Sequence, residues 1–156
     1  MRRDSLVVAT DIHASVEVAW WCLTAGRDAW WPEMRFEAVV GSPLTETWVE
    51  EGRQRSATGS VTRCEEPHLL GFRWAEEGWD HPLDVVIDLV ARGESTSLTL
   101  TESGFIRART SLSLLAEHEE GWRYHVARLK RASEDHAAEV GAHATRARTA
   151  GDRRRR

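Results

Sequence analysis

The sequence has little cysteine, with only Cys22 and Cys64 among its 156 residues. Two cysteines make neither a disulfide framework nor a metal-binding motif, so the fold must depend on a packed core. Long apolar runs are also missing. The run at residues 6–9 ends in polar residues before a signal-peptide core can form, and no stretch approaches the roughly 20 apolar residues of a membrane span. We therefore expect a cytoplasmic protein with no membrane partner.

Several motifs that carry chemistry are absent as well. The sequence has no HExxH pattern, no Cys/His cluster, no glycine-rich phosphate loop between a strand and a helix, and no GxSxG elbow. We expect no metal and no cofactor, and neither nucleotide-dependent nor hydrolase chemistry has a sequence signal.

Charge is distributed unevenly along the chain. The net charge is -4, yet residues 141–156 hold six arginines and one acid, so the remaining body carries about -9. An acidic body argues against nucleic-acid binding. We expect one folded domain at 1–140 and a disordered basic tail at 141–156. The arginine-rich, lysine-poor composition suggests a bacterial source.

Tryptophan is abundant, with eight residues against three phenylalanines and one tyrosine. Such large, rigid side chains commonly fill cores, and in this number they can also line an apolar pocket.

The pattern of the chain predicts an α+β domain. Residues 6–13 form an expected strand, Ser15 can cap a short helix, and a second helical turn ends at Pro32. Residues 35–105 then consist of short β-type runs separated by turn residues, too close together for crossover helices. The sheet is therefore predicted to be antiparallel.

Alternation along the strands predicts which side chains face inward. The expected inner sets are Leu44, Glu46 and Trp48; Leu70, Phe72 and Trp74; Leu83, Val85, Ile87 and Leu89; and Leu98, Leu100 and Glu102.

A long C-terminal helix is expected after Phe105. Thr110 and Ser111 are candidate caps, and the helix should fray near Gly141. Its interior Gly121 suggests close packing or a kink. The apolar stripe of this helix comprises Leu112, Leu115, Trp122, Val126, Leu129 and Ala132.

The order of these elements resembles the helix-grip fold of the START-like, or SRPBCC, superfamily. Segments in family order include Ile12-His13-Ala14-Ser15 before a helix with Ala19-Trp20, where the family has Ala-Pro and Val-Trp, followed by Trp30-Trp31-Pro32, Glu46-Thr47-Trp48, Gly71-Phe72-Arg73-Trp74 and Gly121-Trp122. They are similar to relatives of the activator of the heat-shock-protein-90 ATPase. The resemblance implies a curved seven-stranded antiparallel sheet around a long C-terminal helix, two short helices between strands 1 and 2, and a cavity between sheet and helix.

Glu46 is the most informative candidate, because an inward carboxylate is costly unless it is paired or has a raised pKa. One interpretation makes it a ligand acceptor or general base, and the other pairs it with Arg63, Arg73 or a backbone group. Glu102 follows the same logic, but we expect it to be exposed at the end of its strand.

Trp48, Trp74 and Trp122 should converge between sheet and helix, where they either hold an aromatic ligand or fill the space. Trp20, Trp30 and Trp31 are expected to pack the short helices under the sheet. His118 and His125 can reach the edge of the cavity, at a separation too large for a shared metal. The predicted ligand-binding residues are Glu46, Trp48, Phe72, Trp74, Val85, Ile87, Leu100, His118, Trp122, His125 and Leu129.

Our first hypothesis is therefore a carrier, sensor or sequestering protein for a small apolar or aromatic molecule, acting as a monomer or homodimer. Alternatives that the resemblance implies are a polyketide cyclase-like enzyme with Glu46 as base and His118 or His125 as acid, a self-resistance protein that binds a reactive natural product, and a chaperone-interacting module. We favour a binding protein over an enzyme.

Overall fold

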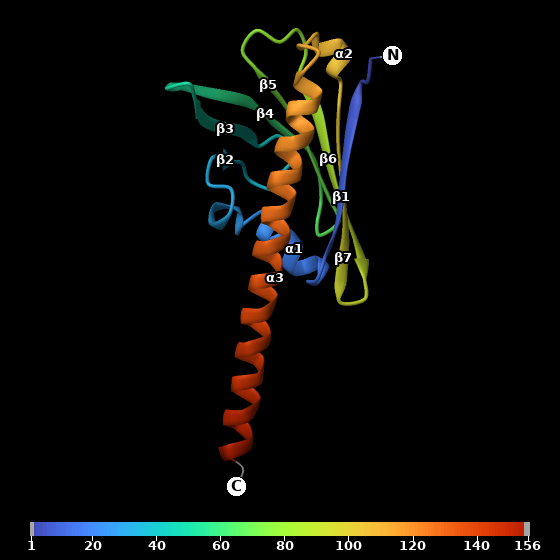
Figure 1. Cartoon of the computed structure of the whole chain (residues 1–156). Helices are drawn as coiled ribbons and strands as arrows, with labels where there is room; N and C mark the ends of the chain where they lie inside the picture. The colour runs from blue at the N-terminus through green and yellow to red at the C-terminus, as the bar shows by residue number, and fades with distance from the viewer. Residues whose placement is uncertain (1, 155–156) are drawn as a thin grey trace.

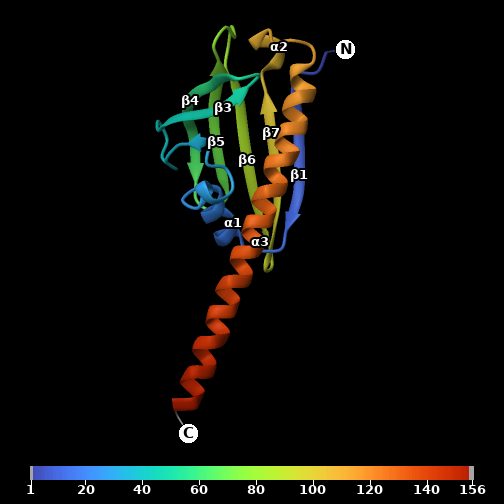
Figure 2. The ribbon, with the colours of Figure 1, turned by 60° about the vertical axis from the view of Figure 1, so that its left-hand side comes forward.

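In the computed structural model, a seven-stranded sheet curves around one side of a long helix (Figures 1 and 2). The structure describes residues 2–154, and from residue 144 onward it describes the backbone only. The elements are, in chain order, β1 (Ser5–Ile12), α1 (Val16–Leu23), the 3-10 helix η1 (Arg27–Ala29), β2 (Met34–Arg35), β3 (Pro43–Glu50), β4 (Arg53–Glu65), β5 (Leu69–Glu76), β6 (Leu83–Arg92), β7 (Ser95–Ser103), α2 (Phe105–Ala108) and α3 (Leu114–Arg154).

Every neighbouring strand pair in the sheet is antiparallel, in the order β1-β7-β6-β5-β4-β3-β2. The predicted sheet, its seven strands and the two short helices between β1 and β2 are confirmed. The register of β4 and β5 shifts between Val61 and Arg63, and such a bulge bends a strand. At Gly59 an added Cβ would lie 1.6 Å from the carbonyl oxygen of Arg73, so only glycine allows this approach of β4 and β5.

The inner face of the sheet forms the core, as the alternation predicts. Phe72, Leu83, Val85, Leu89 and Leu100 are all at most 1% exposed. Burial of such side chains contributes about 25 cal/mol per Å² of apolar area. The two-residue alternation along each strand therefore determines which side chains face the helix.

The helix α3 crosses this face, packs on β1 and α1, and extends beyond the sheet (Figure 1). Polar contacts at the β1 side fix its position: Lys130 Nζ donates to the carbonyl oxygen of Asp11, and the backbone N–H of His13 donates to Glu134. Ser15 caps α1 as predicted, accepting from the N–H of Val18.

Both ends of α3 differ from the sequence expectation. The sequence did not indicate α2, a short helix between two residues with positive φ, Gly104 (102°) and Arg109 (53°). The helix α3 consequently begins at Leu114, so Leu112 is 83% exposed and does not join the apolar stripe.

At its other end α3 continues to Arg154 and does not fray near Gly141. Alanine and arginine, which dominate this stretch, are strong helix formers. The backbone of residues 141–154 is helical, residues 155–156 lie outside the described residues, and the predicted division into a domain and a disordered tail stays a prediction. Among residues 2–154, no helix is both long and apolar enough to cross a bilayer.

Candidate functional site

A fully buried carboxylate, Glu102, lies at the centre of the space between sheet and helix. Trp74 Nε1 donates to its Oε2 at 2.7 Å, and Trp122 Nε1 donates to its Oε1 at 2.9 Å. The Nδ1 atom of His118 lies 2.7 Å from the same Oε1. Three donors on two oxygens satisfy a charge that would otherwise be costly to bury.

Glu102 was expected to be exposed, and that prediction is wrong. Alternation along β7 places Glu102 on the inner face with Leu98 and Leu100. Its donors come from β5 and from α3, where His118 and Trp122 are four residues apart and share one helix face. Only the tertiary fold brings these donors together.

His118 is held in orientation by Glu102, and its side chain is 18% exposed. Burial lowers the pKa of His118, but the hydrogen bond and charge of Glu102, with further contributions from Glu76 and Glu46, outweigh burial and raise it above its usual value. The contact with Glu102 therefore stabilises the protonated form of the imidazole. Its ring also lies against Trp74, Trp79 and Phe105.

Glu46, on β3, accepts a hydrogen bond from Trp31 Nε1 at 2.9 Å. Burial is the main cause that raises its pKa from 4.5 to about 7, and the charge of Glu33 adds to this, while the Trp31 hydrogen bond opposes it. Neither of the two predicted arginine partners is correct. Arg63 pairs with Glu65 and Arg73 with Asp84, all on the exposed outer face of the sheet.

His125 stacks on Trp31, with ring centroids 4.2 Å apart. Burial, helped by the charge of Arg128, lowers the pKa of His125 to about 4, and its Nδ1 has no hydrogen-bond partner among the described residues. Its Nε2 lies 3.9 Å from Oε2 of Glu46. Since Glu46 stays protonated up to about pH 7 and His125 stays neutral down to about pH 4, the two are never charged together. Their contact is not an ion pair.

The aromatic rings form a continuous chain that fills the interior. Trp122 lies 5.6 Å from both Trp31 and Trp74, and Trp74 lies 5.3 Å from Phe72, measured between ring centroids. We call Trp31, Phe72, Trp74, Glu102 and Trp122 the buried cluster. The sequence predicted only a packing role for Trp31. It placed Glu102 at an exposed strand end and so did not predict either residue as part of the site.

Most of the predicted cavity walls are therefore core residues. Among them, Phe72, Trp74, Val85, Ile87, Leu100, Trp122 and Leu129 are each at most 6% exposed. They belong to one hydrophobic core, and their role in ligand binding stays a prediction.

A second group of residues surrounds the buried cluster where it meets solvent. We call this group, whose members are all partly exposed, the margin: Glu46, Trp48, Glu76, Trp79, His118, Gly121 and His125. Glu46 and Glu76 both pair with Ala57 in register, so the two carboxyls flank one small residue on the inner face. Burial raises the pKa of Glu76 too, although His118 and Arg55 oppose the shift.

Gly121 is the unexpected member of the margin. The sequence suggested close packing or a kink there, but a Cβ added at Gly121 would meet nothing within 4 Å. An interior helical glycine costs about 1 kcal/mol relative to alanine. Packing among the described residues does not explain this glycine.

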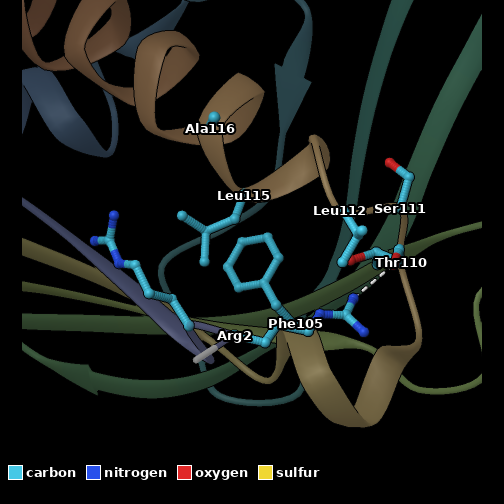
Figure 3. Close-up of a pocket in the computed structure, with 8 residues that line it drawn as sticks. Arg2, Phe105, Thr110, Ser111, Leu112, Leu115 and Ala116 are labelled. Carbon is cyan, nitrogen blue, oxygen red and sulfur yellow. Dashed lines mark hydrogen bonds between the residues drawn. The ribbon is translucent and has the colours of Figure 1, made fainter.

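Hollows of appreciable size lie elsewhere on the molecule. Five of them are formed by described residues, and Glu46, Trp74 and Trp122 line none of the five. Figure 3 shows one, of about 480 Å³, at the N-terminal end of α3, where Arg2 lies beside Phe105 and Leu115. Within the described part of the chain, no three His, Cys, Asp or Glu side chains are placed to hold a metal ion.

Comparison with known families gives a match over most of the chain. The profile described as Activator of Hsp90 ATPase homolog 1-like protein matches residues 13–134. No curated protein gives a significant match.

Solved structures with the same fold include a protein from a natural-product biosynthetic locus. DynU16, from the dynemicin biosynthetic locus, is 26% identical with a TM-score of 0.67 over 83% of this chain, which spans only 46% of DynU16. CalU16 from Micromonospora echinospora is 22% identical, with a TM-score of 0.61 and 87% of each chain covered. The Aha1 dimer from Colwellia psychrerythraea is 20% identical, with a TM-score of 0.69 over 85% of this chain and 97% of its own.

Proposed function

This chain belongs to the Activator of Hsp90 ATPase homolog 1-like family, and on that premise we propose that it binds a small aromatic molecule at the margin between β3 and α3. The observation that carries the proposal is Glu46. Its carboxyl is partly exposed beside aromatic rings, and its pKa is raised to about 7. Such a group donates or accepts a hydrogen bond near neutral pH and is costly to keep without a role.

The margin offers the mixture of surfaces that small-molecule sites use. Trp48 and Trp79 supply apolar area for stacking, while Glu46, His118 and His125 supply a few polar atoms that fix orientation. His125 Nδ1 has no partner among the described residues, so it is one further polar atom available for pairing. We infer that the predicted walls deeper in the core support these residues and do not contact the ligand.

Calorimetric titration with flat aromatic probes tests the proposal. The probes are 2-naphthol, 2,6-dihydroxynaphthalene and 2,6-dihydroxyanthraquinone. We expect at least one to bind, and we expect Trp48→Ala to weaken that binding about tenfold, because the variant loses buried apolar area and a stacking contribution of about 0.5–1.5 kcal/mol. Trp21→Ala is the control, since Trp21 stacks on His136 away from the margin. A wild-type protein that binds none of the probes contradicts the proposal.

Acid–base catalysis is a second candidate function, of the polyketide cyclase-like kind. It is favoured by the combination of Glu46, whose pKa lies near 7, with His118, whose protonated form Glu102 stabilises. One group can accept a proton while the other donates one. With a turnover assay in hand, Glu46→Gln should abolish the reaction, because glutamine cannot accept or release the proton. Unchanged turnover in that variant would remove Glu46 from the mechanism.

The DynU16 likeness favours a natural-product ligand within this proposal, because DynU16 comes from a biosynthetic locus. Sequestration of such a product and catalysis on it are separated by one result, namely whether the bound molecule is recovered unchanged. No residue of the margin points to a chaperone partner.

A further inference from the structure

We propose that a flat polycyclic ligand lies against the backbone of α3 at Gly121, with one oxygen-bearing end beside His118 and the other beside Glu46 and His125. This inference rests on the proposed function and names the ligand class of the same site.

Close packing explains why Gly26 and Gly59 have no side chain, but it does not explain Gly121. A Cβ at Gly26 would lie 2.4 Å from the ring of Trp21, and a Cβ at Gly59 would overlap the backbone of Arg73. At Gly121 the same atom would meet nothing within 4 Å. A glycine inside a helix, with open space over it, allows an external group to approach the backbone closely.

The helical repeat shows which way Gly121 faces. Lys130 contacts β1 through Asp11 and lies nine residues, or about two and a half turns, from Gly121. Gly121 therefore points away from β1. His125, one turn further along, contacts Glu46 on β3. The open space over Gly121 is thus on the β3 side of α3, within the margin.

The ends of this surface are polar and its middle is bare. His118 uses Nδ1 for Glu102, and no described residue bonds its Nε2. His118 and His125 are seven residues apart on one helix face, a separation of about 10 Å along the axis. Three fused rings span a similar length. The site therefore suits a flat molecule with a hydroxyl or carbonyl at each end.

Charge at the margin restricts the ligand further. Glu46 and Glu76 flank Ala57, and the buried Glu102 lies behind His118. Three carboxyl groups around one imidazole disfavour a multiply charged anion. A neutral phenol or ketone fits this balance.

The experiment uses 2,6-dihydroxyanthraquinone as the probe and compares Gly121→Ala with wild type. The new methyl group fits the free protein, so we expect the Tm to rise by roughly 2–4 °C. The same methyl occupies the space proposed for the ligand, so we expect the Kd to rise tenfold or more. Gly141→Ala adds an identical methyl farther along α3, where an added Cβ also meets nothing within 4 Å, and should leave the Kd unchanged.

The outcomes separate this inference from the proposed function. A probe that binds wild type and Gly121→Ala equally overturns the placement at Gly121 and leaves the proposed function standing. A wild-type protein that binds neither this probe nor the smaller ones overturns both. 2,6-Dimethylanthraquinone, which keeps the shape and ring carbonyls but lacks the terminal hydroxyls, should bind more weakly than the dihydroxy probe, and equal affinity would contradict the polar ends.

Discussion

His118 Nδ1 lies 2.7 Å from Oε1 of Glu102, so a charge-assisted hydrogen bond joins α3 to the innermost face of β7. The carboxylate is completely buried, whereas the imidazole is partly exposed. The pair therefore connects the core of the protein to the margin at which we place the ligand.

Replacing Glu102 by glutamine should destabilise the protein by about 3 kcal/mol. Glutamine keeps the shape but has one acceptor oxygen for three donors, so at least one of Trp74, Trp122 and His118 loses its partner. Urea unfolding at pH 7 measures the change. Glu119→Gln is the control, because Glu119 pairs only with exposed arginines and should lose less than about 1 kcal/mol.

Glu46→Gln should be more stable than wild type at pH 8, by about 3 kcal/mol, and about equal to it at pH 4.5. The pKa of Glu46 is raised from 4.5 to about 7 in the folded state, so folding binds a proton. The stability that this contributes is complete below pH 4.5 and is lost as the pH rises to about 7. Unfolding curves of both proteins across this range measure the difference, and a difference independent of pH would contradict the raised pKa.

His125→Phe should have the opposite pH dependence. The pKa of His125 falls from 6.5 to about 4 on folding, so wild type loses stability as the pH falls through that window. Phenylalanine keeps the stacking on Trp31 and removes the titration. Relative to its difference at pH 7, the variant should gain about 3 kcal/mol over wild type by pH 4. A stability difference between the two proteins that does not change with pH would contradict the lowered pKa of His125.

His118→Phe should cost more stability at pH 6 than at pH 9. Glu102 raises the folded pKa of His118, so the stability from this pair is present below 6.5 and is lost as the pH rises through the folded value. Losing a hydrogen bond to a charged group costs about 2 kcal/mol. Equal losses at both pH values would show that the imidazole is neutral in the folded protein.

The sequence predicted the sheet well because its signals are local. Two-residue alternation in β5, β6 and β7 shows which side chains are buried, and close spacing of turn residues leaves room only for hairpins. The start of α3 was harder to predict from the sequence. Residues 105–113 contain both helix formers and caps, and the positive φ of Arg109, which separates α2 from α3, has no sequence signature.

The sequence identified several residues of the candidate site but not the hydrogen bonds that join them. Alternation placed Glu46 and Glu102 on the inner face. Their donors, Trp31 in the loop before β2 and Trp122 in α3, meet them only in the folded chain. Gly121 was visible as an unfavourable helix residue, yet the space over it depends on how α3 is turned relative to β3.

Indole N–H resonances offer the most direct test of binding at the margin. In a two-dimensional ¹H–¹⁵N spectrum titrated with 2,6-dihydroxyanthraquinone, we expect the indoles of Trp48 and Trp79 to shift at saturation. We expect Trp30, whose indole donates to Cys22 in the core, to remain in place. Unchanged Trp48 and Trp79 signals, or shifts confined to residues around Arg2 and Leu115, would contradict the account.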